Sequence, residues 1–142
     1  MATSLSQGKI HMKGAAAILI VASISMAHAT EPATLTLTCR GTTTTIAEDA
    51  KPEPISMGIT LNFTARTMVG FYSPSGEGFP VKITGLNEAN VAFGGSNKTD
   101  TWLIDGNIDR ATGDVEASSM IFDQTTRSFV PSVSYSLKCR SA

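Results

Sequence analysis

The segment Ile55-Ser56-Met57-Gly58-Ile59-Thr60-Leu61-Asn62-Phe63-Thr64 alternates between apolar residues and polar or small ones. Successive side chains of a β-strand point to opposite faces, so this pattern places all five large apolar residues on one face. A helix has a period of 3.6 residues and would mix the two classes. The segment therefore predicts a strand with one face in an apolar core.

The same alternation occurs near both ends of the chain, around Leu37-Thr38-Cys39 and around Leu137-Lys138-Cys139. Runs rich in β-branched and aromatic residues lie between them at 68–72, 79–84, 89–93, 101–109 and 114–122. Proline, glycine, serine and asparagine separate these runs, which is where turns are expected. We therefore expect about eight short strands. Residues 42–45 either extend the first strand or form a loop.

Eight short strands joined by short connections predict an antiparallel meander. An open meander leaves two unpaired edges, and pairing the first strand with the last removes both. We expect a small all-β, up-and-down barrel closed at this seam. A two-sheet β-sandwich with the same strands is the alternative.

The chain has two cysteines, Cys39 and Cys139, and both fall on the apolar faces of their strands. Two cysteines allow one connectivity, so an exported chain is expected to join them in a disulfide across the seam. A redox-active pair is the alternative, but catalytic cysteines are usually close in sequence. The spacing therefore favours a structural bridge.

Residues 1–29 have the layout of a secretory signal peptide, with cleavage predicted after Ala29. Lys9 and Lys13 precede an apolar run, the segment contains no acid, and it ends in Ala27-His28-Ala29. The apolar stretch spans 13 residues, whereas a bilayer-spanning helix needs about 20. We expect a single β domain over residues 30–142, located in the periplasm or secreted, with no membrane span.

Removal of this segment changes the charge and the available chemistry. Two of the 11 basic residues are lost, leaving 9 against 12 acids and a net charge of −3. Both histidines, His11 and His28, are lost as well. A mature chain without histidine excludes a Ser-His-Asp triad, a Cys-His dyad and a histidine metal site. The negative charge argues against nucleic-acid binding. We predict no metal and no cofactor.

The acidic stretch from Trp102 to Glu116 contains the one candidate for chemistry. Asp105, Asp109 and Glu116 are expected to share the outer face across a hairpin, where they form a candidate cluster for acid/base catalysis or Ca²⁺ binding. The alternative is that they are solvated, and that Asp109 organises the turn. The sequence predicts a tight hairpin turn here, formed by Arg110, Thr112 and Gly113. Gly113 is expected in the left-handed conformation.

The inward-facing positions are almost wholly apolar. A barrel of eight strands either fills its interior with such side chains or holds one small apolar ligand. The large size of Phe, Trp and Met favours a filled core. The expected inward set is Leu35, Phe63, Val69, Phe71, Ile83, Phe93, Trp102, Ile104, Ile108, Val115, Ile121, Val133 and Leu137.

Three segments carry a resemblance to a known family. Residues 37–41 (Leu-Thr-Cys-Arg-Gly), 106–113 (Gly-x-Ile-Asp-Arg-x-Thr-Gly) and 135–139 (Tyr-x-Leu-x-Cys) resemble a family of small exported two-cysteine β proteins of alphaproteobacteria. This resemblance implies the fold and export and implies no activity. The chain is more weakly similar to the periplasmic inhibitors of c-type lysozyme, which implies an eight-stranded barrel. Residues 73–78 are a poor counterpart of their Ser-Gly-Ser-Gly-like inhibitory loop.

These observations predict a non-enzymatic exported barrel that binds either a partner protein, such as an envelope or extracellular protein, or a small apolar ligand. A carboxylate-dependent enzyme acting on an envelope glycan is one alternative. A structural envelope protein, or a protein resembling the lysozyme inhibitors, is another.

Overall fold

The computed structural model describes residues 33–47 and 49–142. The predicted signal peptide, its cleavage point and both histidines lie outside these residues.

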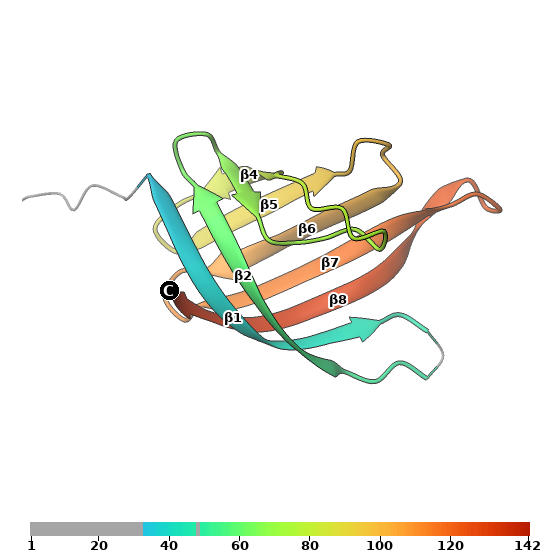
Figure 1. The fold of residues 1–142 in the computed structure, drawn as a ribbon, viewed down its shortest axis with the longest axis horizontal. Coiled ribbons are helices and arrows are strands. Elements are labelled where there is room, and N and C mark those ends of the chain that lie inside the picture. The colour runs from blue at the N-terminus through green and yellow to red at the C-terminus, as the bar shows by residue number, and fades with distance from the viewer. Residues whose placement is uncertain (1–32, 48) are drawn as a thin grey trace, which may run out of the picture. The chain divides into compact units, whose positions relative to one another are not determined.

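Eight antiparallel strands form one closed barrel in sequential order (Figure 1). This confirms the predicted all-β barrel and decides against the two-sheet sandwich. The strands are β1 (Thr34–Thr45), β2 (Glu53–Asn62), β3 (Thr67–Val69), β4 (Val81–Leu86), β5 (Asn90–Ser96), β6 (Trp102–Asp109), β7 (Asp114–Asp123) and β8 (Ser128–Ser141).

The seam between β1 and β8 closes the barrel, and Figure 1 shows these two strands side by side. Their pairing runs from Leu37 opposite Ser141 to Thr45 opposite Val133, so residues 42–45 extend the first strand. Cys39 lies directly opposite Cys139 and forms the predicted disulfide with it. Both cysteines are buried, so the bridge lies on the inner face of the barrel.

The middle of the barrel is filled by large apolar side chains. Ile59 and Leu61 of β2 are almost fully buried, as their alternation predicts. The ring of Phe93 stacks on Phe71 with centroids 5.5 Å apart, and Phe79 meets Trp102 edge-on at 5.3 Å. Such aromatic pairs stabilise a core beyond their buried area.

Two residues of the expected inward set are exposed instead. In β3, Met68 is 1 % exposed and Val69 is 46 % exposed, so the inner face belongs to Met68. The strand ends there, and Gly70, with φ 149°, redirects the chain so that Phe71 enters the core. The predicted strand at 68–72 was therefore too long at its C-terminal end.

Ile121 is the second exception, with 39 % of its surface exposed. The register of β7 and β8 shifts between Ser118 and Met120, and the pairing of β1 with β8 ends at Thr45. Beyond this point the β7–β8 hairpin has no β1 residue beside it, and Figure 1 shows the hairpin projecting past the barrel. Ile121 therefore lacks the neighbours that would bury it.

The up-and-down order gives the barrel two different ends. The turn end carries the short connections 63–66, 87–89 and 110–113 together with the outer ends of β1 and β8. The loop end carries the connections 46–52, 70–80, 97–101 and 124–127. Each end carries one candidate binding region.

Candidate functional site

The three carboxylates singled out by sequence lie on the outer face, but they do not form one cluster. Asp105 and Glu116 border the same shallow depression across β6 and β7, and Asp109 does not border it. Glu116 pairs with Asn107, and Asp105 pairs with Ser118, so the two carboxylates of the depression are diagonal neighbours. Among residues 33–47 and 49–142, no group of three acidic, cysteine or histidine side chains has the arrangement to hold a metal ion.

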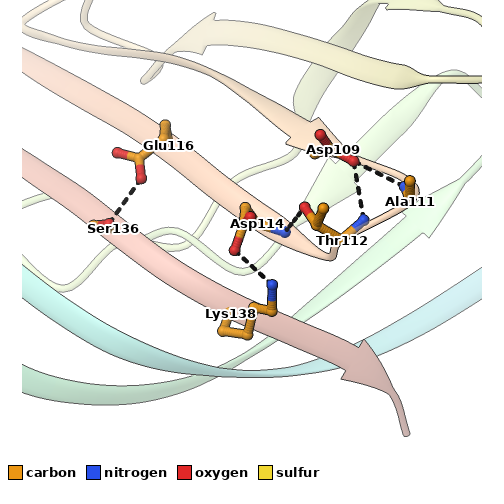
Figure 2. Close-up of polar contacts among 7 residues, drawn as sticks. All are labelled: Asp109, Ala111, Thr112, Asp114, Glu116, Ser136 and Lys138. Atoms are coloured by element: carbon orange, nitrogen blue, oxygen red, sulfur yellow. Dashed lines mark hydrogen bonds and ion pairs between the residues drawn. The ribbon is translucent and has the colours of Figure 1, made fainter.

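Asp109 organises the turn between β6 and β7. Its carboxylate accepts hydrogen bonds from the backbone N–H groups of Ala111 at 2.9 Å and Thr112 at 3.0 Å (Figure 2). The bond from Thr112 has the largest effect on the pKa of Asp109, and the bond from Ala111 the next largest. Both stabilise the ionised carboxylate and so hold this pKa below its ordinary value. Gly113 follows with φ 77°, and its N–H donates to the carbonyl of Asp109 at 2.8 Å.

Two other acidic side chains of this hairpin contact residues of β8. Glu116 accepts a 2.7 Å hydrogen bond from the hydroxyl of Ser136, as Figure 2 shows. Lys138 forms a 2.9 Å ion pair with Asp114, and both side chains are more than half exposed. Exposed pairs of this kind contribute little to stability. The hairpin is thus a set of local polar contacts on an outer wall.

The loop end contains a feature that the sequence analysis missed, an open edge on β2. β2 pairs with β1 along its length, but its pairing with β3 covers only Thr60 to Asn62. Phe63 donates its N–H to the carbonyl of Ala33, so residue 63 directs its backbone groups to the β1 side. Backbone groups alternate in direction along a strand, and the β1–β2 register is uninterrupted. The odd-numbered residues of β2 therefore direct their N–H and C=O groups to β1. The backbone groups of Ser56 and Gly58 therefore face the other side, where no strand of the described residues pairs with them. The backbone of Gly70 packs against the carbonyl of Gly58, so the open groups are both backbone groups of Ser56 and the N–H of Gly58.

An apolar hollow lies next to this edge. Its volume is about 340 Å³, and its main side chains are those of Ile55, Met57, Phe71, Tyr72 and Tyr135. The ring of Phe71 meets Tyr135 edge-on at 5.1 Å, and burial raises the pKa of the Tyr135 hydroxyl. Tyr72 is 63 % exposed, so a large aromatic surface faces solvent at the mouth of the hollow.

The connection 70–80 forms one wall of this region and is internally tied. Ser73 donates its N–H to Glu77 at 2.9 Å and accepts from the N–H of Gly76 at 2.8 Å, while its side chain is buried. Tyr72 forms an isolated β-bridge with Gly78. The predicted loop segment 73–78 is therefore a compact turn beside the open edge.

The sequence contains weak signals for this region. Pro54 lacks an N–H at a position that faces the open side, as expected for an edge strand. Gly70 marks the point where β3 leaves β2.

Comparison with protein-family models, with curated proteins and with solved structures finds no match to this chain. In the part of the chain that the structure describes, no helix has the length and apolar character needed to cross a bilayer.

Proposed function

We propose that this protein is an exported, non-enzymatic binding protein that docks an extended segment of a partner protein against the open edge of β2. The observation that carries the proposal is the position, beside the apolar hollow, of the backbone groups of Ser56 and the N–H of Gly58, which pair with no strand of the described residues. An added strand gains affinity from main-chain hydrogen bonds and specificity from pockets that receive its side chains. Here the hollow under Tyr72 would receive one apolar side chain.

Two exposed apolar residues support an interface at the open edge. Val69 is 46 % exposed and lies opposite Thr60 where the pairing of β2 with β3 ends, and Tyr72, 63 % exposed, borders the same surface depression. Exposed apolar surface gathered in one region marks interaction sites more often than scattered single residues do. The tied 70–80 connection would present this surface with little loss of entropy on binding.

The disulfide supports a location outside the cytosol. Structural disulfides persist in oxidising compartments such as the periplasm or the extracellular space. Together with the signal peptide predicted at residues 1–29, the bridge between Cys39 and Cys139 favours a protein that meets its partner in the envelope or outside the cell.

Two alternatives have less support. A carboxylate-dependent enzyme would need Asp109 near Asp105 and Glu116, but the carboxylate of Asp109 is bonded to its own turn. For the lysozyme-inhibitor alternative, segment 73–78 lies in a loop, but Pro74 and Glu77 interrupt the Ser-Gly-Ser-Gly-like pattern expected of the inhibitory loop.

Amide hydrogen exchange tests the proposal directly. In the protein alone, the amides of Ser56 and Gly58 should exchange much faster than those of Met57 and Ile59, which face β1. Envelope partners are to be identified with a photo-crosslinking residue at position 72, and position 105 on the opposite wall is the matched control. In the presence of the crosslinked partner, the two fast amides should become protected. A partner that leaves them fast, or that crosslinks equally from both positions, would contradict the proposal.

A further inference from the structure

We infer that the turn end of the barrel holds a second, separate site, a cavity for a small apolar molecule that carries an anionic group. The cavity opens among the 110–113 turn and the outer ends of β1, β2 and β8, and has a volume of about 350 Å³. This is at the lower end of the range of about 300–1,000 Å³ that is typical of ligand sites. It lies at the opposite end of the barrel from the β2 edge.

Apolar side chains form the floor and walls of the cavity. Leu61, Val91 and Ile108 are between 1 % and 4 % exposed and belong to the filled core below. Leu35 and Phe63 line the cavity higher up and are only partly buried. Covering this remaining surface with a ligand would gain about 25 cal/mol for each Å² removed from water. The chemistry of these walls selects an apolar ligand body.

The cavity is built on rigid elements. Cys139 lines it, and the disulfide to Cys39 fixes β8 against β1 at this point. The 110–113 turn is joined to the same strand, because Cys139 donates its N–H to the carbonyl of Gly113 at 2.8 Å. A site that exists before the ligand arrives loses little free energy in ordering itself.

Two arginines border the opening and favour an anionic group on the ligand. Arg110 donates to the carbonyl of Asn87 at 2.8 Å, which anchors it at the rim. Arg140 borders the opening from the outer face of β8, because Cys139 before it faces inward, and its side chain makes no hydrogen bond or ion pair with any residue in 33–47 or 49–142. A guanidinium group pairs with a carboxylate or sulfonate through charge-assisted hydrogen bonds.

One acid, Asp109, borders the same opening. Its carboxylate already accepts two backbone hydrogen bonds, from Ala111 and Thr112, and these bonds keep the charged group against the 110–113 turn. The guanidinium of Arg140, on the outer face at the rim, is therefore the group that an anionic group projecting out of the opening would meet.

Two fluorescent probes with the same aromatic rings test this inference. Anilinonaphthalene sulfonate carries an anionic group, and N-phenylnaphthylamine is its neutral analogue. With the protein purified as the cell produces it, we expect one sulfonate probe to bind per chain, at least fivefold more tightly than the neutral probe. The preference should shrink as salt is added, because salt screens exposed charges. Equal affinity for the two probes at low salt would overturn the anionic part of the inference.

Variants then locate the probe. Leu35→Trp fills the cavity from a partly exposed position and should weaken both probes at least tenfold. Ser118→Trp, at an exposed position of β7 that does not line the cavity, should leave both unchanged. Arg140→Glu changes one exposed side chain and should weaken the sulfonate probe alone, so the inference stays testable if Leu35→Trp fails to fold. Binding that survives Leu35→Trp but is lost in Tyr72→Ser would assign the probe to the loop end and overturn the site, leaving the proposed partner interface intact.

Discussion

Cys39 and Cys139 face each other across the β1–β8 seam with Cα atoms 4.0 Å apart, and the disulfide between them is one crosslink between the first and last strands of the barrel. In an antiparallel pair, close Cα atoms of this kind occur where the two residues exchange no backbone hydrogen bonds. The bridge therefore adds to the ladder on either side of it without replacing a ladder bond.

Removing this bridge should strongly destabilise the protein. The disulfide joins residues 100 positions apart, and a loop of that length corresponds to about 4.7 kcal/mol when the effect is assigned to the entropy of the unfolded chain. We expect the double variant Cys39→Ala/Cys139→Ala to lose about 2–5 kcal/mol in urea unfolding. Adding a reductant should destabilise the wild-type protein and leave the double variant unaffected. Equal free energies of unfolding with and without the disulfide would contradict a stabilising role for this crosslink at the β1–β8 seam.

Two glycines with similar backbone conformations provide a matched test of the β6–β7 turn. Gly113 has φ 77° and Gly76 has φ 82°, so alanine at either position meets the same left-handed strain, roughly 1–2 kcal/mol. A Cβ at Gly76 would meet nothing within 4 Å, whereas at Gly113 it would collide with the backbone carbonyl of Cys139. Gly113→Ala should therefore cost at least twice as much as Gly76→Ala in thermal or urea unfolding. Similar losses at both positions would contradict a close contact between the turn and β8.

Sequence alone predicts the parts of this fold that depend on local pattern. The alternation from Ile55 to Phe63 fixes the strand and its buried face, and the positions of Cys39 and Cys139 predict both the bridge and the closing pair of strands. Local sequence pattern gives the wrong burial where tertiary contacts determine which side chain faces inward. Val69 fits an inward position in the alternation, but β3 ends beside it and Met68 takes the inner face.

The candidate sites were harder to predict for the same reason. Whether the backbone groups of Ser56 find a partner depends on how far β3 runs along β2, and β3 lies outside the segment that defines β2. The turn-end cavity depends on how the 110–113 turn sits against β8, which no local pattern encodes. The acidic stretch was conspicuous in sequence, but the carboxylate of Asp109 is bonded to its turn.

Asp109 stabilises the fold through its hydrogen bonds to the 110–113 turn, and this stabilisation should depend on pH. Its pKa in the folded protein is below the ordinary value, so the ionised carboxylate stabilises the fold above the unfolded-state pKa. This contribution is lost as the pH falls through the lower, folded-state pKa. We expect Asp109→Asn to be less stable than wild type near neutral pH and the difference to vanish by about pH 2. Urea unfolding of both proteins across this range measures it, and a difference that does not change with pH would exclude the charge as its source.

Proline substitutions at two positions on the same side of β2 test whether its edge is open. Ser56 and Thr60 both direct their N–H groups away from β1, but Thr60 lies opposite Val69 of β3, whereas Ser56 lies beyond the end of that pairing. Proline removes the N–H, so Thr60→Pro breaks a ladder bond and leaves its acceptor unsatisfied, which should cost about 1–3 kcal/mol. Ser56→Pro removes a donor that has no partner among residues 33–47 and 49–142 and repeats the arrangement of Pro54, so its cost should stay below about 1 kcal/mol. The same variant removes one of the donors that an added strand would use, and it should therefore weaken partner binding while the barrel remains folded. A Ser56→Pro protein as unstable as Thr60→Pro in urea would mean that the edge is already paired.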